Sequence, residues 1–222
     1  MSSSRRKRPA VSEEEQSDQS NGKPLTLFTP VPNAKVVIVH KMTKIDTLKQ
    51  IYGDTVSVVD VTSKSSLPYV KFSPFYPWKD GIPIATDSSK TAVSVEGIWQ
   101  GLKVFENEGI STKHLQNDTM QNVKRSATRL RGKVLGHSAT VTDEITLLEY
   151  IDARKQIYLP AYKYVLDNYL QKEVALLANM VRELDTTLCL KDYTTNSDVD
   201  DVTQPLSHAS LIAAYIKGQW PN

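Results

Sequence analysis

Cysteine is almost absent from the sequence, and long apolar runs are absent altogether. The single cysteine, Cys189, has no partner for an internal disulfide and excludes a metal site built from several cysteines. Because its neighbours in TTLCLKDY are largely apolar, we expect a buried, unreactive thiol. No stretch approaches the roughly 20 apolar residues of a transmembrane helix, and no secretory signal follows the start. We therefore expect a soluble, intracellular protein without a membrane partner.

An excess of charge of one sign is missing as well. Lysine and arginine number 27 against 25 acidic residues, which leaves a formal net charge of +2. The chain as a whole therefore has no basic field of the kind that attracts nucleic acids. Its 222 residues suffice for one domain with a sizeable core, or at most two small ones.

The first 24 residues contain almost nothing that could enter a core. After Met1, the apolar side chains of this segment are Ala10 and Val11, so we expect a disordered tail followed by a domain over residues 25–222. The tail carries a basic run whose function is open between a nuclear localisation signal, a phosphate contact and a solvated segment with no role. The run consists of Arg5, Arg6, Lys7 and Arg8. In a eukaryotic host it would allow a nuclear location.

Hydrophobic periodicity predicts an α+β fold, in which a single, mainly helical domain carries a small sheet. Short β-branched runs predict strands at 34–41, 55–62 and 187–194. Helical spacing predicts helices at 44–53, 94–106 and 205–218, and a long helical region over 143–184 that kinks or restarts at Pro160. Prolines make 69–78 an edge strand or extended loop, and 80–92 is expected to be a loop. Residues 111–142 are polar and basic, with a short helix at their start.

The helix expected at 94–106 has unusually distinct faces. Ser94 is a plausible N-cap, and Gly97 and Gly101 form a strip that would let another backbone or a ligand approach closely. Three apolar residues should face the core: Ile98, Leu102 and Phe105. Four polar or aromatic residues share a sector of about 100°: Glu96, Trp99, Gln100 and Lys103. This sector is either an ordinary solvent-exposed face or one wall of a ligand site, which the indole favours.

Two segments, FSPFYPW (72–78) and SVEGIWQGLKVFE (94–106), together resemble the paired signature of the NADAR superfamily. That family includes an N-glycosidase acting on riboflavin biosynthesis intermediates and ADP-ribosyl hydrolases. The matching residues are Phe72, Ser73, Phe75, Tyr76, Ser94, Glu96, Trp99, Gln100 and Lys103. Gly97 stands where the enzymes often have His, and Asp192 in KDYTTN stands in place of their Asp before a Trp-Gly pair. The blocks 152–168 and 190–221 resemble a mostly bacterial family of unknown function that shares the front signature.

The resemblance, which covers about residues 35–221, implies a NADAR-like fold and hydrolysis of an N-glycosidic bond at a ribosyl C1′. Such a reaction needs a carboxylate to stabilise an oxocarbenium-like transition state and another to activate water. Glu96 and Asp192 are the candidates, while Lys103 is a candidate nucleophile or phosphate ligand. The expected substrate-binding residues are Phe72, Ser73, Phe75, Tyr76, Trp99, Gln100 and Tyr193. The substrate would be a nucleotide or ADP-ribose-type small molecule or an ADP-ribosylated nucleic acid, with no cofactor and no metal.

Several features leave alternatives open. The pocket could belong to a non-catalytic nucleotide or ADP-ribose-binding module, or to a structural or interaction protein that reuses the fold. The acidic loop from Asp198 to Asp201 could bind calcium, but it lacks the glycine and glutamate of an EF-hand, which favours turn-forming carboxylates. His208 is expected to cap a helix or lie in the core. The basic segment of Arg125, Arg129, Arg131 and Lys133 could hold a diphosphate or form a solvated loop.

Overall fold

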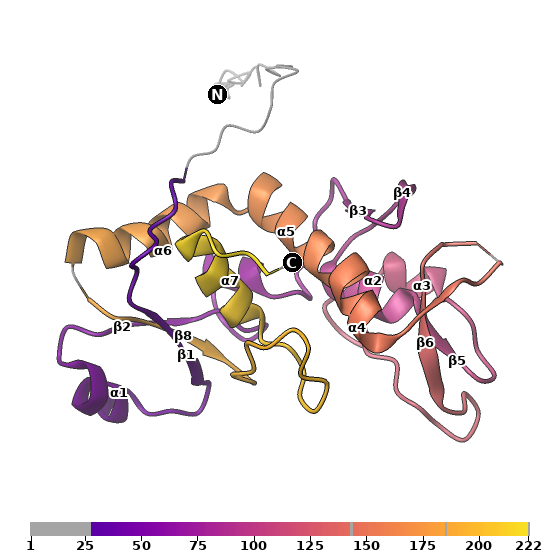
Figure 1. Ribbon diagram of the computed structural model, residues 1–222, viewed down its shortest axis with the longest axis horizontal. Helices are drawn as coiled ribbons and strands as arrows, with labels where there is room; N and C mark the ends of the chain where they lie inside the picture. Colours follow the sequence, from indigo (N-terminus) through magenta and orange to yellow (C-terminus); the bar gives the residue numbers. More distant parts are fainter. Residues whose placement is uncertain (1–27, 143, 185, 222) are drawn as a thin grey trace, which may run out of the picture.

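The computed structural model describes residues 28–142, 144–184 and 186–221. The predicted tail and its basic run therefore lie outside the described residues. A three-stranded parallel sheet lies at one end of the molecule and a small antiparallel sheet at the other (Figure 1). A long helical stretch that ends in α5 runs between them. None of the helices in the described ranges is long and apolar enough to cross a membrane.

The parallel sheet consists of β1 (Val36–His40), β2 (Ser57–Asp60) and β8 (Leu188–Asp192), with β8 in the centre. All three strands were predicted, and the structure confirms them. Side chains of β8 alternate between the two faces, as in any strand. Leu188 and Leu190 enter the main core, which α6 (Gln171–Leu184) and α7 (His208–Lys217) cover. Cys189 faces the other way and is buried against Leu48 of α1 (Ile45–Tyr52).

Residues 69–92 differ from the prediction in part. Tyr69–Phe72 form a short 3-10 helix, η1, directly after Pro68, and residues 73–78 form a loop, which was one of the two predicted alternatives. The expected loop at 80–92 contains a hairpin of β3 (Ile82–Ile84) and β4 (Asp87–Ala92). In β3 the side chains of Ile82 and Ile84 are fully buried, whereas residues 88–91 of β4 are exposed. A buried strand of three residues and an exposed polar strand give no periodic signal in the sequence.

The helix expected at 94–106 is shorter than predicted. Helix α2 covers Val95–Gly101, capped as predicted by the Ser94 side chain, which accepts a hydrogen bond from the Gly97 N–H at 3.0 Å. The chain then turns into strand β5 (Lys103–Phe105), which pairs with β6 (Val134–Ser138). Strand β7 (Leu147–Leu148) completes this antiparallel sheet.

The two glycines of α2 admit a neighbouring helix rather than a ligand. The short helix α3 (Thr112–Leu115) packs directly against α2. A Cβ atom on Gly97 would lie 2.8 Å from the His114 carbonyl oxygen, and one on Gly101 would lie 2.5 Å from the Leu115 side chain. The close approach that the two glycines predicted is therefore present. The group that approaches α2 is helix α3, through its backbone and the Leu115 side chain.

The long helical region begins at Tyr150 and continues through Pro160 without a restart. It consists of α4 (Tyr150–Ala153), a π-helical turn (Arg154–Tyr158) and α5 (Leu159–Asn168). Proline lacks an N–H group, and its ring collides with the carbonyl four residues earlier in a regular α-helix. The wider turn lies immediately before Pro160 and closes with a hydrogen bond from the Leu159 N–H to the Arg154 carbonyl.

The last helix follows the prediction at both ends. The Ser207 side chain caps α7, and Gly218 ends it in the left-handed conformation with φ 69°.

The described elements confirm the predicted α+β class, but the strands form three small sheets instead of one.

Candidate functional site

A pocket of about 350 Å³ opens where the parallel strands end. Asp192 is the last residue of β8, and Ser63 follows β2, so the pocket lies at the carboxyl edge of the sheet. Ligands of open sheets with parallel strands bind at this edge. Eight residues predicted for the site line the pocket: Ser73, Phe75, Glu96, Trp99, Gln100, Lys103, Asp192 and Tyr193.

Two predicted substrate-binding residues do not line it. The Phe72 side chain is completely buried in the main core, and its carbonyl oxygen accepts a hydrogen bond from the Tyr162 hydroxyl at 2.6 Å. Tyr76 packs edge-on against Trp78, with ring centroids 5.0 Å apart. Both aromatic residues therefore support the segment that carries Ser73 and Phe75 instead of facing a ligand.

Three predicted residues form a chain of hydrogen bonds along one wall. The Gln100 amide donates to Oε1 of Glu96 at 2.8 Å, and the Lys103 ammonium donates to Oε1 of Gln100, also at 2.8 Å. The backbone N–H of Arg125 donates to the same Gln100 oxygen at 2.8 Å. The side-chain oxygen of Gln100 thus already accepts two hydrogen bonds, so only its NH₂ group is left for the predicted binding of a substrate.

Glu96 is a buried carboxylate with one unbonded oxygen. The residue is 8% exposed, and no hydrogen bond to its Oε2 atom is found among the described residues. Burial raises the pKa of Glu96, and the hydrogen bond from Gln100 and the nearby cations Lys124, Lys103 and His208 offset this only in part. A carboxylate of this kind, in a pocket, is well suited to accept a proton.

Lys103 begins β5, and its ammonium group has only neutral partners. Besides Gln100, it donates to the backbone carbonyl of Arg125 at 3.2 Å. Burial lowers the pKa of Lys103, the Glu96 charge raises it, and Arg125 and Lys124 lower it again. A lowered pKa is what a nucleophilic lysine needs. Lys103 could also bind a phosphate group, because the negative charge of the phosphate would raise the pKa of the lysine and favour its charged form.

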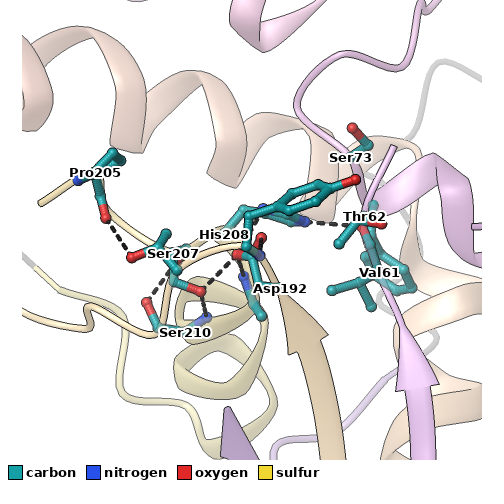
Figure 2. Close-up of polar contacts among 12 residues, drawn as sticks. Val61, Thr62, Ser73, Asp192, Pro205, Ser207, His208 and Ser210 are labelled. Atoms are coloured by element: carbon teal, nitrogen blue, oxygen red, sulfur yellow. Dashed lines mark hydrogen bonds and ion pairs between the residues drawn. The ribbon is translucent and has the colours of Figure 1, made fainter. Parts of the chain in front are cut away.

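Asp192 is committed to the protein by both of its oxygens. Oδ1 accepts the backbone N–H of Tyr193 at 2.7 Å, and Oδ2 accepts the Ser207 hydroxyl at 2.7 Å and the Ala209 N–H at 3.3 Å. Oδ2 also lies 3.0 Å from Nδ1 of His208. This arrangement connects the end of β8 to the first turn of α7 (Figure 2).

His208 is held as an imidazolium. Its Nε2 lies 2.9 Å from the Val61 carbonyl, which can only accept a hydrogen bond, while Nδ1 faces the Asp192 carboxylate (Figure 2). Burial opposes the His208 charge, but Asp192 and the Val61 carbonyl outweigh it and raise the pKa. Burial likewise opposes the Asp192 charge, yet His208 and the hydrogen bonds from Ser207 and Tyr193 leave the pKa of Asp192 below its ordinary value. The expected cap or core histidine is thus a buried cation that lines the pocket.

The basic segment 125–133 holds the protein together more than it binds a ligand. The Arg125 guanidinium donates to the carbonyls of Gln100, Lys103 and Gly109 and pairs with Glu108 at 2.7 Å. Arg131 pairs with the second oxygen of Glu108 at 2.6 Å. Arg125 and Arg131 are therefore engaged in contacts within the protein, whereas Arg129 and Lys133 are exposed.

Two further cations line the pocket without an acidic partner of their own. Arg154 is 2% exposed, and its guanidinium donates to the carbonyls of Val199 and Asp201 at 2.7 and 2.8 Å. Lys124 makes no ion pair with any described residue and lies over the Phe75 ring at 5.8 Å. Four Lys and Arg side chains line the pocket against two carboxylates, so the pocket favours an anionic ligand although the chain is nearly neutral.

The acidic loop after β8 is shaped by its own carboxylates. Oδ1 of Asp198 accepts the Asp200 N–H, and Oδ1 of Asp201 accepts the Thr203 N–H and hydroxyl. These are turn-forming contacts of the expected kind. In the described part of the chain, no group of three or more His, Cys, Asp or Glu side chains is arranged to hold a metal ion.

The aromatic walls of the pocket come from Phe75, Trp99, Tyr150, Tyr158 and Tyr193. The Trp99 ring is fixed from behind by His137, whose ring centroid lies 3.8 Å away. His137 is buried, and burial together with the charges of Lys103 and Arg125 lowers its pKa to about 3, so it is neutral. An indole supported in this way offers a rigid apolar surface to a base or sugar.

Lys124, Arg154 and Tyr158 were not predicted as site residues. Arg154 and Tyr158 lie four positions apart before Pro160, within the block that resembles a bacterial family, and this spacing was the available signal. For Lys124 the sequence offers no signal, because the segment that carries it has almost no regular structure.

Comparison with models of protein families gives a match over most of the chain. A model described as a family of unknown function (DUF6939) matches residues 40–212, a range that includes the whole pocket from Ser63 to His208. Comparison with curated proteins and with solved structures gives no match. The family match links the chain to no activity and not to the NADAR superfamily, whose resemblance is carried by the motif residues alone. Because the matched range covers well over half of its length, the chain belongs to this family of unknown function.

Proposed function

We propose that this protein is a hydrolase that cleaves an N-glycosidic bond at the ribosyl C1′ of a nucleotide-like or ADP-ribosylated substrate. The observation that carries the proposal is Glu96, a buried carboxylate with a raised pKa and one unbonded oxygen, in a pocket otherwise rich in cations. The resemblance of the surrounding motif to NADAR enzymes supports the reaction class.

The pocket suits a ligand with phosphate, sugar and aromatic parts. Its volume of about 350 Å³ lies in the range of small-molecule sites. Lys103, Lys124 and Arg154 supply positive charge for phosphate groups. Trp99 and Phe75 supply apolar surfaces for the base and the ribose.

In the proposed reaction, Glu96 activates water. As the C1′–N bond breaks, its electron pair leaves with the nitrogen, and the ribosyl carbon becomes oxocarbenium-like. Nicotinamide leaves NAD as a neutral base, whereas a nitrogen that leaves as an anion takes a proton from solvent. A water oxygen bonds to C1′ and gives its proton to Oε2 of Glu96. Because both oxygens of Asp192 are already bonded, we assign Asp192 to positioning His208 and Tyr193 instead of to proton transfer.

One observation favours a second function, a non-catalytic nucleotide or ADP-ribose-binding module. The pocket contains a single carboxylate with an unbonded oxygen, whereas glycoside hydrolysis ordinarily uses two. The two functions differ in one measurable outcome. The wild-type protein is incubated with NAD, ADP-ribosylated DNA and riboflavin-pathway intermediates, and free base or ribose phosphate is detected by chromatography. Release of product supports the hydrolase, and saturable binding of ADP-ribose without release supports the binding module.

A further inference from the structure

Tyr158 brings to the pocket a hydroxyl group that other parts of the described chain leave without a partner. The hydroxyls of Tyr162 and Tyr169 donate to the carbonyls of Phe72 and Gly81, and that of Tyr215 donates to Asp167. No hydrogen bond to the Tyr158 hydroxyl is found among the described residues, although its side chain is mostly buried and lines the pocket. The hydroxyl oxygen is not one of the buried polar atoms without a partner, so it is open to a water molecule or a ligand in the pocket.

The ring of Tyr158 is held rigidly. It packs edge-on against Trp99 at 5.8 Å between centroids and lies parallel to the Tyr162 ring at 6.3 Å. Tyr158 is the last residue of the π-helical turn before Pro160, and turns of this kind occur frequently at functional sites. The hydroxyl is therefore aimed by the fold and is not free to seek a partner elsewhere.

The surroundings keep this hydroxyl protonated. Burial raises the pKa of Tyr158 well above its ordinary value, and the charges of Glu96 and Asp192 raise it further. Among the groups around it, Glu96 has an unbonded oxygen and Asp192 has none. The Tyr158 hydroxyl is thus a neutral donor on which the charge of Glu96 acts, and Oε2 of Glu96 is available as an acceptor.

We propose that the Tyr158 hydroxyl is a catalytic residue that holds the attacking water together with Glu96. The hydroxyl donates to one lone pair of the water oxygen, and one water proton points to Oε2 of Glu96. The second lone pair of the water is then directed at C1′, where the new C–O bond forms as the C1′–N bond breaks. This inference rests on the proposed hydrolase and adds a residue to its chemistry.

The test is the Tyr158→Phe variant, which removes the hydroxyl and keeps the ring packing. Its matched control is Tyr69→Phe, since the Tyr69 hydroxyl also has no hydrogen bond among the described residues and lies outside the pocket. With NAD, ADP-ribosylated DNA or a riboflavin-pathway N-glycoside as substrate, we expect kcat to fall by about 10²-fold. KM and the melting temperature should stay within error of wild type, and the control should match wild type throughout.

A second readout is specific to the water. When methanol is added as a competing nucleophile, loss of the hydroxyl should lower the hydrolysis product relative to the methyl glycoside. An unchanged kcat, or an increase in KM at constant kcat, would overturn the role of Tyr158 while leaving the hydrolase in place. A wild-type protein that cleaves none of these substrates would contradict the hydrolase itself, and the role of Tyr158 with it.

Discussion

At the scale of single residues, the site contains a buried charge whose desolvation lowers the stability of the folded protein. Glu96 is buried, yet its hydrogen bond partner is a neutral amide and the nearby ammonium group of Lys103 is bonded to that amide instead. Desolvation therefore dominates its pKa. Functional residues of this kind commonly oppose stability.

The first prediction follows from this cost. Above the ordinary pKa of 4.5 the unfolded chain releases the Glu96 proton more readily than the folded protein, so stability falls as the pH rises through 4.5 toward the raised folded pKa. We expect Glu96→Gln to be more stable than wild type at pH 7 and equal to it below pH 4. Urea unfolding at both pH values measures this difference. A variant that is less stable at pH 7 would show that Glu96 is a structural anion.

The sequence identified the residues of the site that belong to a local motif. Glu96, Trp99 and Gln100 lie on one side of α2 because helical periodicity fixes their relative directions. Lys103 lines the same pocket although it begins strand β5, so its place does not come from that periodicity. Phe72 and Tyr76 were misplaced because a motif says which segment is at the site, but not which of its side chains turn inward. The ion pair of His208 with Asp192 joins residues from two elements, and no periodicity within either element encodes it.

At the scale of elements, α2 is shaped by what packs against it. Its glycines let α3 approach, and its polar face closes the pocket on the other side. The end of α2 was predicted too late because Lys103 to Phe105 fit a helical pattern. Their strand partners in β6 lie about thirty residues further on, beyond the reach of local patterns.

The second prediction concerns this packing. A Cβ atom on Gly97 would lie 2.8 Å from a backbone carbonyl oxygen, which cannot move away as a flexible side chain could. We expect Gly97→Ala to lower the free energy of unfolding by ~1–3 kcal/mol through overpacking. Gly109→Ala is the control, because its Cβ would make an ordinary contact of 3.5 Å with Ile145. Equal stability of the two variants in denaturant titrations would refute the packing of α3 on α2.

At the scale of the whole molecule, the pocket lies where separate parts of the chain meet at the carboxyl edge of the parallel sheet. The strands were predictable because β-branched runs mark them, and the N-cap and C-terminal glycine of α7 were predictable from local chemistry. The antiparallel sheet was not, since its strands are short and separated by long polar segments. The His208–Asp192 pair fastens α7 to the sheet across this junction.

The third prediction uses the pH dependence of that pair. The raised pKa of His208 stabilises the fold below 6.5, and this stabilisation is lost as the pH rises through the folded pKa. The lowered pKa of Asp192 stabilises the fold above 3.8, and this is lost as the pH falls through its folded pKa. We expect His208→Gln to lower the melting temperature most between pH 3.8 and 6.5. The exposed His40, changed to Gln, should have little effect. A loss that does not vary with pH would mean that the pair is not ionised.

The central claim is that the pocket around Glu96 hydrolyses an N-glycosidic bond, and the most direct measurement compares turnover with binding in one pair of proteins. Wild type and Glu96→Gln are mixed with NAD, ADP-ribosylated DNA and riboflavin-pathway intermediates. Released base is quantified by chromatography, and ADP-ribose binding is measured by calorimetry. We expect the wild-type protein to release base from at least one substrate. The variant should release at least ~10²-fold less while still binding ADP-ribose. Binding by both proteins with no release by the wild type, or equal release by the two, would contradict the account.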